Sequence, residues 1–321
     1  MGFYYSQFLV RPSYPTNSFA GQTVLVTGAN VGLGLEATRH FLRLQAARVI
    51  LAVRNVAAGE DAKQELESST GRAGVCEIWE LDLASYASVQ AFAQKAAQLP
   101  RIDVVVANAA IATTNFNLAE GHERTITVNV ISTILLVLLL FPKLRETAKK
   151  YPEAPRPRLT VVVSETHAWT PFPEYKAANT FEELDNRATA DMVNRYASSK
   201  LMEIMILREI VDRASDAEQH VVVNMVNPGL CHSKLARETG WGFWLFKQLV
   251  ARSTEVGSRT LLAGASAGAE SHGKYMTDGK VADTALSAFV RSPEGKKAQH
   301  KLLAELIPIL ERIDSSIMQN L

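Results

Sequence analysis

The chain alternates between short apolar runs and longer stretches in which apolar residues recur at helical spacing. Apolar runs rich in β-branched residues predict strands at 23–27, 48–53, 76–81, 104–107, 159–164 and 221–226. Between them, the spacing of apolar residues predicts helices at 33–44, 88–99 and 197–214. Strands that alternate with helices form parallel sheets, and strands buried on both faces are apolar throughout. The pattern therefore predicts an α/β fold, a single doubly wound parallel sheet with helices on both faces.

Several segments lie outside this alternation. An aromatic N-terminal arm covers 1–20, and residues 165–190 read as a long, loop-like insertion. The most apolar run, 130–141, is too short to span a bilayer and predicts a buried helix. We expect one domain over 21–321 that ends in a helix at about 293–314.

Composition excludes several classes of function. The 321 residues are 47% hydrophobic and carry a net charge of +1, so nothing in the charge favours nucleic acid or an anionic membrane. The two cysteines, Cys76 and Cys231, lack metal-ligand spacing and predict free thiols in a reducing compartment, with no metal site. The N-terminus lacks the basic segment and cleavage site of a signal peptide. We expect a cytoplasmic protein without a transmembrane segment.

A glycine-rich turn joins the first predicted strand to the first predicted helix. It reads TGANVGLG, with Gly28, Gly32 and Gly34 in a G-x-x-x-G-x-G spacing. Glycine lets the backbone approach a phosphate, and the following helix N-terminus offers unpaired N–H groups and a positive dipole end. In a doubly wound sheet, this turn lies at the edge where ligands bind. It predicts a dinucleotide site; glycines that serve packing alone are the alternative.

Further short motifs follow in a fixed order. They are DL (82–83), ANAA (107–110), Asn129 in TVNV, Ser164 closing TVVVS, YASSK (196–200) and NPG (227–229). With the glycine turn, this series resembles the short-chain dehydrogenase/reductase family, with one departure: Ile111 stands at a position where that family has glycine. The segment LAVRN, the long insertion and the C-terminal helix resemble retinol-dehydrogenase-like members from fungi.

The resemblance implies a set of cofactor contacts. The turn and the DL and ANAA motifs would hold the dinucleotide, and Ser233 stands where the family usually has a threonine that contacts the nicotinamide amide. The cofactor contacts that the resemblance implies are Gly28, Asn30, Gly32, Leu33, Gly34, Asp82, Leu83, Asn108, Ala109, Tyr196, Lys200, Gly229 and Ser233.

The end of the second predicted strand bears on the choice between NAD and NADP. An acidic residue there binds the ribose hydroxyls of NAD, whereas an arginine accepts the extra phosphate of NADP. Here Val53 occupies the expected acidic position and Arg54 follows it. A guanidinium can chelate a phosphate, and no carboxylate repels it. We predict NADP (NADPH); an arginine that is merely solvated at a helix start is the alternative.

Tyr196 and Lys200 stand four residues apart on a predicted helix, so their side chains share a face. A phenol has a pKa of ~10, and a nearby ammonium lowers it by favouring the phenolate. Lowering it by about 3 units takes about 4 kcal/mol. Lys200 together with a bound nicotinamide cation could supply this. We predict that Tyr196 transfers a proton; a surface pair is the alternative for this motif taken alone.

Ser164 and Asn129 complete the predicted catalytic set. Ser164 ends a strand, where its hydroxyl can donate to a substrate carbonyl oxygen; capping the next turn is the alternative. The resemblance implies that Asn129 holds a water linking Lys200 to bulk solvent, whereas an asparagine satisfied by backbone groups is the alternative. His167 lies close to Ser164, but the chain has no G-x-S-x-G elbow, so a nucleophilic serine is rejected.

Aromatic residues mark the predicted substrate side. We expect a lid at about 233–253 over the nicotinamide end of the cofactor, and Trp169, Phe172 and Tyr175 could line the same pocket. The lid carries Trp241, Phe243, Trp244, Leu245 and Phe246. These side chains predict an apolar or aromatic small-molecule substrate. Core packing, or a patch that touches a membrane or partner, is the alternative.

These observations favour an NADP-dependent oxidoreductase that moves a hydride between nicotinamide and a carbonyl or carbinol carbon. Reduction of a ketone or aldehyde in fungal secondary metabolism is the expected direction and setting. One alternative is a nucleotide-holding protein with a non-redox role, as cyclase, isomerase or scaffold, which the departure at Ile111 would suit. Another is a dehydrogenase anchored to a membrane surface by 1–20 or 241–246. A homodimer could form through the helices at 130–141 and around Tyr196, but burial within one chain explains them equally well.

Overall fold

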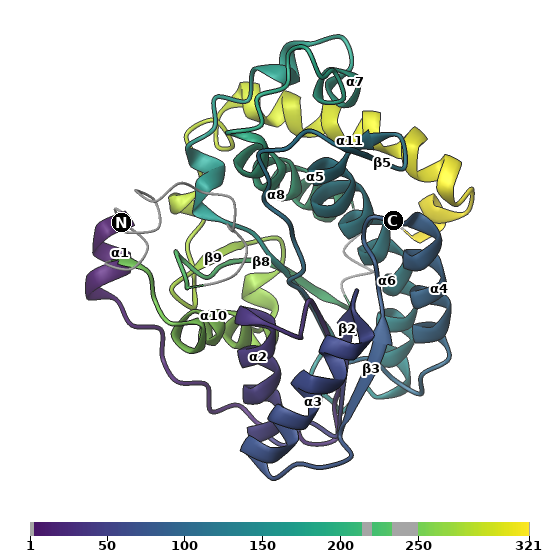
Figure 1. Ribbon diagram of the computed structural model, residues 1–321, viewed down its shortest axis with the longest axis vertical. Coiled ribbons are helices and arrows are strands. Elements are labelled where there is room, and N and C mark those ends of the chain that lie inside the picture. The colour runs from purple at the N-terminus through teal and green to yellow at the C-terminus, as the bar shows by residue number, and fades with distance from the viewer. Residues whose placement is uncertain (1–2, 214–219, 233–249, 321) are drawn as a thin grey trace.

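The structure is a computed structural model that describes residues 3–213, 220–232 and 250–320 (Figure 1). Its described part contains an eight-stranded sheet in the order β10-β9-β8-β7-β4-β1-β2-β3. The strands are β1 Thr23–Thr27, β2 Arg48–Val53, β3 Cys76–Glu80, β4 Val104–Ala107, β7 Arg158–Val162, β8 Val222–Asn227, β9 Tyr275–Thr277 and β10 Lys280–Val281.

Seven of these strands pair in parallel, and β10 alone runs antiparallel to its neighbour β9. The chain builds the sheet outwards from β1 through β2 to β3 and then crosses to β4, on the other side of β1. This is the doubly wound Rossmann order, and ligands of such sheets bind outside the carboxyl ends of the strands where the direction reverses. The predicted fold class is confirmed. The point of reversal lies between β1 and β4.

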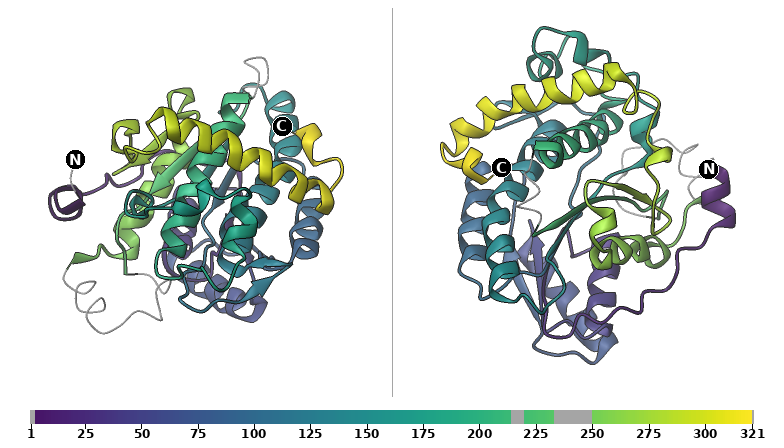
Figure 2. Two further views of the ribbon diagram at one scale, coloured as in Figure 1. Left: turned by 90° about the horizontal axis from the view of Figure 1, so that it is seen from above. Right: turned by 180° about the vertical axis from the view of Figure 1, so that it is seen from behind.

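Helices cover both faces of the sheet, as the two views of Figure 2 show. One buried apolar cluster joins the sheet to α2 Gly32–Arg43, α3 Val56–Thr70 and α10 Thr254–Ser266. The other joins it to α4 Tyr86–Ala97, α6 Ser132–Lys150, α8 Arg195–Arg213 and α11 Pro293–Ile313. Apolar strands need cover on both sides, which explains why helices from both halves of the chain are required.

The apolar run at 130–141 belongs to a longer helical segment than the sequence suggested. Arg124–Lys150 has a mean hydropathy of 2.2 in its most apolar window and is long enough to cross a membrane, so the argument from shortness was wrong. However, 89% of that window is buried inside the protein. Burial within one chain therefore accounts for its composition, and the homodimer stays a prediction.

The insertion at 165–190 is more ordered than the loop that was predicted. It holds two 3₁₀ turns, η2 Glu165–Ala168 and η3 Pro173–Lys176, and the short helix α7 Thr180–Leu184. Buried Phe172 and Phe181 attach it to the core. Such short turns give no sustained periodicity, which explains why the sequence pattern missed them.

The remaining short elements lie around this framework. At the N-terminus, α1 Phe3–Leu9 forms a helix at the edge of the molecule, and the chain then runs to Phe19, which packs in the core (Figure 1). Between β4 and α6 come the hairpin β5 Leu118–Ala119 and β6 His122–Glu123, the turn α5 Arg124–Ile126 and the π-helical turn η1 Thr127–Ile131. Toward the C-terminus lie η5 Ala269–Ser271, η6 Asp283–Ala285 and η7 Ile317–Asn320.

Candidate active site

The glycine turn between β1 and α2 has the shape of a phosphate cradle. Gly28 and Gly32 have φ angles of +65° and +62°, in the region that favours glycine. A Cβ on Gly34 would collide with the carbonyl oxygen of Gly28 and lie 2.7 Å from Nδ2 of Asn108. At the start of α2, Val31 offers no side-chain cap, whereas Asn55 caps α3. The first N–H groups of α2 thus lack an N-cap side chain and can receive an anion.

Asn108 and Thr27 fix this turn against the end of β4. The Oγ1 of Thr27 accepts from the backbone N–H groups of Asn108 and Ala109, both at 2.9 Å. In return, Nδ2 of Asn108 donates to the carbonyl of Thr27 at 2.9 Å. The two strand ends on either side of the reversal point are thereby locked together, and the predicted cofactor residues Gly28, Asn108 and Ala109 meet in one place.

We expect Gly34→Ala to lower the free energy of unfolding by about 1–3 kcal/mol, the usual effect of overpacking, and to weaken dinucleotide binding. The added methyl group would press on backbone that cannot move without opening the turn. Gly59→Ala is the matched control inside a helix. The atoms nearest to its methyl group would be side-chain methyl groups of Val53 and Ile78, at 2.8 Å, rather than backbone. Denaturant titration of both variants would show the difference, and equal losses would contradict the packing argument.

Ser164, Tyr196 and Lys200 converge beside this edge of the sheet. Tyr196 and Lys200 lie in α8, with the Lys200 Nζ 5.9 Å from the centroid of the Tyr196 ring. Nζ also donates to the carbonyl of Val162, at the end of β7, at 2.8 Å. Desolvation raises the pKa of Tyr196, while the charge of Lys200 and a hydrogen bond with Ser164 lower it. Desolvation outweighs the other two effects, so the pKa of Tyr196 is raised on balance. The structure brings the three predicted residues together.

The Ser164 hydroxyl both caps a turn and faces Tyr196. Its Oγ accepts from the N–H of Thr166 at 3.2 Å and from the Thr166 hydroxyl at 3.0 Å. Two donors fill the lone pairs of the oxygen, so its own hydrogen remains to be donated. Ser164 therefore caps the turn, as the alternative has it, and can still donate its hydrogen to a substrate oxygen, as predicted.

His167 is engaged by backbone groups rather than by the serine hydroxyl. Its Nδ1 lies 2.8 Å from the carbonyl of Ser164, and its Nε2 accepts from the N–H of Ser287 at 3.1 Å. Burial lowers the pKa of His167 and favours the neutral ring. Because both nitrogens are occupied in this way, His167 cannot act as a base for a nucleophilic serine.

Asn129 lies in the π-helical turn η1 and clamps the segment after β4. Its Oδ1 accepts from the N–H of Ile111, and its Nδ2 donates to the carbonyl of Ile111 and to Oγ of Ser199, each at 2.9 Å. The side chain of Asn129 is thus satisfied within the protein, mostly by backbone groups, as the alternative has it. Isoleucine in place of the family's glycine at position 111 does not disturb these hydrogen bonds, because Asn129 bonds only to the backbone of Ile111.

The other predicted cofactor residues lie along the same edge. Arg54 is exposed at the end of β2, and Asp82 follows β3, where its Oδ1 accepts from the N–H of Ala84 at 2.9 Å. Gly229 follows β8 with a φ of +75°. Leu83 is buried, Asn30 and Leu33 are partly buried in the turn and the first turn of α2, and Ser233 lies outside the described residues.

Two polar residues of this edge, Thr27 and Asn227, open motifs quoted above, but no role was predicted for either of them. Thr27 holds the turn as described above. Asn227 joins three strand ends: its Oδ1 accepts from the N–H groups of Glu165 and Gly229, and its Nδ2 donates to the Thr277 hydroxyl at 3.2 Å. Both are polar residues at the carboxyl ends of predicted strands, a signal that could have identified them.

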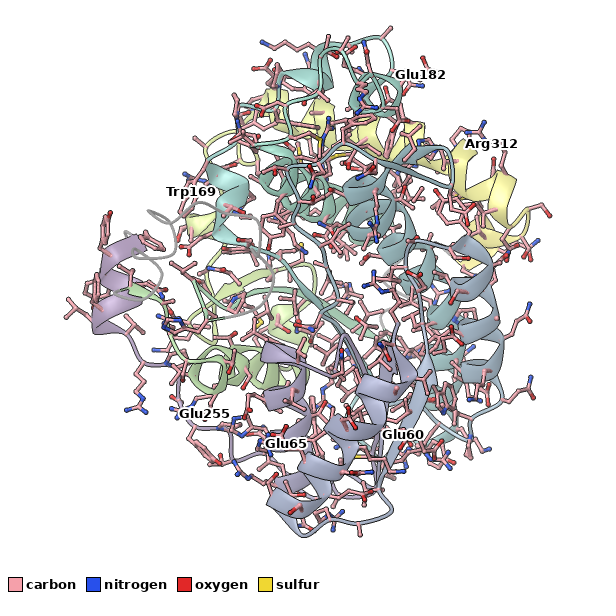
Figure 3. All side chains as sticks on the ribbon, in the orientation of Figure 1. Glu60, Glu65, Trp169, Glu182, Glu255 and Arg312 are labelled. Atoms are coloured by element: carbon pink, nitrogen blue, oxygen red, sulfur yellow. The ribbon has the colours of Figure 1, made fainter. Side chains whose placement is uncertain are left out.

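The predicted substrate side is only partly described. The aromatic residues at 241–246 lie outside the described residues. Phe172 is fully buried in the core, so its assignment to a pocket was wrong, because it anchors the insertion instead. Trp169, labelled in Figure 3, is 57% exposed. Its ring packs edge to face on Phe3 of α1, with the ring centroids 5.6 Å apart.

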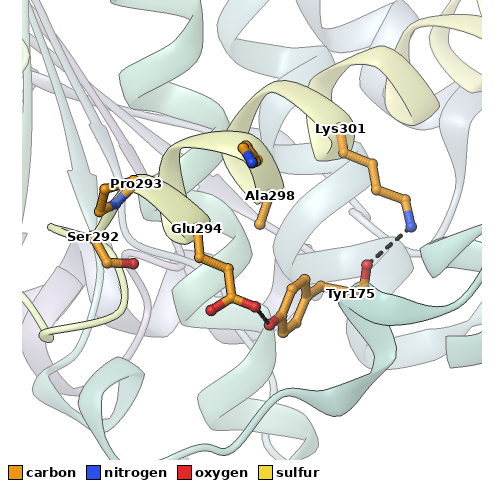
Figure 4. A pocket seen from close by; sticks show the side chains of 7 residues that line it. Tyr175, Ser292, Pro293, Glu294, Ala298 and Lys301 are labelled. Carbon is orange, nitrogen blue, oxygen red and sulfur yellow. Dashed lines mark hydrogen bonds between the residues drawn. The ribbon is translucent and has the colours of Figure 1, made fainter.

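Tyr175 lines a pocket at the start of α11 (Figure 4), and none of the residues predicted to bind cofactor lines it. Its hydroxyl donates to Glu294, and Lys301 donates to its carbonyl at 2.9 Å. In the described part of the chain, no group of three or more His, Cys, Asp or Glu side chains could hold a metal, and the buried Cys76 and Cys231 form no disulfide.

Known proteins resemble this chain over its full length. A family model described as short chain dehydrogenase matches residues 22–150. A short chain dehydrogenase/reductase from Cryptosporiopsis sp. (strain 8999) is 44% identical over 327 residues, 100% of both chains. A short-chain dehydrogenase from Penicillium roqueforti (strain FM164) is 45% identical, covering 97% of this chain and 83% of its own.

A solved structure, the NADPH-bound carbonyl reductase from chicken fatty liver, shares the fold. It covers 83% of this chain and 99% of its own, with a TM-score of 0.60 at 19% identity. The fold alone follows from such a distant structure, whereas the identity to the fungal proteins over whole chains establishes descent. The chain belongs to the short-chain dehydrogenase/reductase family of oxidoreductases.

Proposed function

We propose that this protein is an NADP-dependent oxidoreductase that reduces a ketone or aldehyde group of an apolar small molecule. The observation that carries the proposal is the convergence of Ser164, Tyr196 and Lys200 at the carboxyl edge of the sheet, beside the glycine turn. A scaffold or regulator that only held a nucleotide would need the turn but not these three side chains.

The residues of the turn suit a dinucleotide. The cradle of Gly28, Gly32 and Gly34 and the uncapped start of α2 would hold the pyrophosphate, and Arg54 would face the extra phosphate of NADP. When bound, the reduced nicotinamide supplies a hydride to the carbonyl carbon. No side chain of the proposed set has to change its oxidation state.

The chain's own residues would manage the proton and the developing negative charge. The Ser164 hydroxyl donates to the substrate oxygen and stabilises the charge that grows on it. Tyr196 donates its phenolic proton to the same oxygen, and the charge of Lys200 stabilises the phenolate that remains. Asn129 donates to the hydroxyl of Ser199, which in turn donates to the carbonyl of Tyr196. Asn129 would thereby help to position Tyr196 relative to the segment after β4.

Arg54→Asp should reverse the cofactor preference. In the wild type we expect NADPH to bind more tightly than NADH by at least about tenfold, since a guanidinium–phosphate pair contributes more than a kcal/mol. The carboxylate would repel the phosphate and accept hydrogen bonds from the ribose hydroxyls instead. Fluorescence titration of both proteins with both cofactors measures this. Arg11→Asp, at another exposed arginine, controls for the change in net charge. Unchanged preference in Arg54→Asp would contradict the role of Arg54.

Attachment to a membrane surface is a second candidate property. It is favoured by the outer face of α1, where Tyr4, Phe8 and Leu9 are 63%, 57% and 74% exposed. Aromatic and aliphatic side chains on a short amphipathic helix can enter the headgroup region. Flotation with liposomes of phosphatidylcholine would test it. Protein that stays at the bottom of the gradient would exclude it.

A further inference from the structure

Lys200 has a neighbour of opposite charge that no motif of the sequence singles out. Its Nζ lies 2.7 Å from Oε2 of Glu203, one helical turn further along α8. The two side chains are only 3% and 2% exposed. From Ala197 to Leu207 every residue of α8 is buried, and Lys200 and Glu203 are the charged ones among them. The pair therefore lies within an otherwise uncharged stretch of the helix, directly beside the residues of the proposed reaction.

Packing alone does not explain a glutamate at this position. Removing a carboxylate from water is costly, and buried ion pairs are often no more stable than well-packed apolar residues of similar volume. The cost is visible here, since burial raises the pKa of Glu203 to about 7 even though the charge of Lys200 lowers it. Removing only one partner of such a pair leaves an uncompensated buried charge. Glu203 thus gives Lys200 a buried counter-ion at 2.7 Å.

We propose that Glu203 is a positioning residue for the reaction, the buried counter-ion that keeps Lys200 charged and holds it one turn from Tyr196. The inference rests on the proposed function, in which the charge of Lys200 stabilises the phenolate. Glu203 touches neither substrate nor cofactor. Its own charge raises the pKa of Tyr196, so the stabilisation of the phenolate that we propose comes through Lys200.

Other titratable groups around the pair are engaged elsewhere. Glu165 of η2 interacts with Arg252 and Asp278, and Cys231, after β8, acts on Tyr196. On the side of α11, Lys296 and His300 pair with Glu209. Within the described part of the chain, Lys200 is the charged group that acts on the Glu203 carboxyl.

The test compares kcat of the wild type with kcat of Glu203→Gln at several pH values. Both proteins are assayed with NADPH and with two carbonyl compounds, acetophenone and menadione. The quantity of interest is the ratio of wild-type kcat to variant kcat. At pH of about 6 both proteins carry an uncharged residue at 203 beside a charged Lys200, so we expect rates within about twofold. At pH of about 8.5 the variant has a buried ammonium without a counter-ion, which loses its proton, and we expect the wild type to be at least about tenfold faster. The KM for the carbonyl compound should change less than kcat. A ratio that is constant across pH would overturn the proposal.

Two further variants separate positioning from folding. Glu203→Asp keeps the charge and should restore part of the rate at alkaline pH. Glu209→Gln removes another buried glutamate of α8, one paired with Arg213 and His300, and should leave the ratio independent of pH. If the ratio of wild-type kcat to variant kcat rises with pH as much for Glu209→Gln as for Glu203→Gln, any loss of a buried glutamate from α8 has this effect. That result would overturn the role of Glu203.

A measurement without turnover keeps this inference distinct from the proposed function. If the wild type neither binds NADPH nor reduces the panel, the proposed function fails. The interaction between Glu203 and Lys200 can then be measured from the pH dependence of the free energy of unfolding. A carboxyl whose folded pKa is raised from 4.5 to about 7 loses stability as pH rises through that window, so the wild type should lose stability relative to Glu203→Gln. In a Lys200→Met background, the folded pKa of Glu203 should rise further, so the loss should continue to higher pH and become larger. An unchanged loss would contradict the interaction.

Discussion

Tyr196→Phe should lower kcat for carbonyl reduction by about a hundredfold to ten-thousandfold, the usual contribution of a positioned general acid. The substitution removes one oxygen atom and leaves the ring beside Lys200. Without the hydroxyl, no acid stands beside Ser164 to protonate the substrate oxygen, and the charge of Lys200 has no phenolate to stabilise. Binding of NADPH should remain close to that of the wild type, because the glycine turn is untouched.

Tyr175→Phe is the matched control. It removes a hydroxyl that bonds to Glu294 at the start of α11, and kcat should stay within about twofold of the wild type, as for other surface substitutions. Steady-state kinetics over a range of pH measures both variants. If Tyr196→Phe keeps full activity on a substrate of the wild type, the proton-transfer role of Tyr196 is wrong, and another group must protonate the substrate oxygen.

Phe41→Ala should lower the free energy of unfolding by about 3–5 kcal/mol, the range for an aromatic side chain removed from a core. Phe41 is fully buried in α2, and its ring packs edge to face on Phe19 at 4.8 Å. The N–H of Phe19 also donates to the carbonyl of Leu44 at 2.8 Å. The cavity would therefore loosen α2 from the segment that leads into β1, on the helix whose N-terminus is proposed to hold the pyrophosphate.

Phe8→Ala is the control for this change, because Phe8 is 57% exposed on α1. Its loss should alter the free energy of unfolding by no more than about 0.5 kcal/mol. Guanidinium titration followed by circular dichroism gives both values. If Phe41→Ala lowers the free energy of unfolding by less than about 1 kcal/mol, the surrounding side chains have moved in to fill the cavity. The core around Phe41 would then be less rigid than its burial indicates.

Periodicity predicted the framework of the fold because the central strands are long and apolar. The six predicted strands all occur; three have the predicted ends, and the ends of the other three differ by no more than two residues. The strands β9 and β10 were missed, since three and two residues are too few to show a pattern. The insertion at 165–190 was read as a loop because its structure depends on contacts such as those of buried Phe172, which only the folded chain brings together.

Local motifs located the candidate site but not the contacts that support it. Tyr196 and Lys200 were found from their spacing, because residues four apart share a helical face. Glu203 was not found, although it lies one turn from Lys200, because ion pairs three apart on a helix are common on surfaces and only burial makes this one unusual. The clamp of Asn129 on Ile111 joins residues 18 apart in sequence, and no spacing rule predicts it.

The most direct test of the central claim is calorimetric titration of the wild-type protein with NADPH and with NADH. The account predicts one site per chain with NADPH bound at least about tenfold more tightly, a difference of about 1.4 kcal/mol or more. That result would support the cradle of Gly28–Gly34 and the role of Arg54 together. Tighter binding of NADH would contradict the reading of Arg54, and binding of neither cofactor would contradict the oxidoreductase mechanism itself.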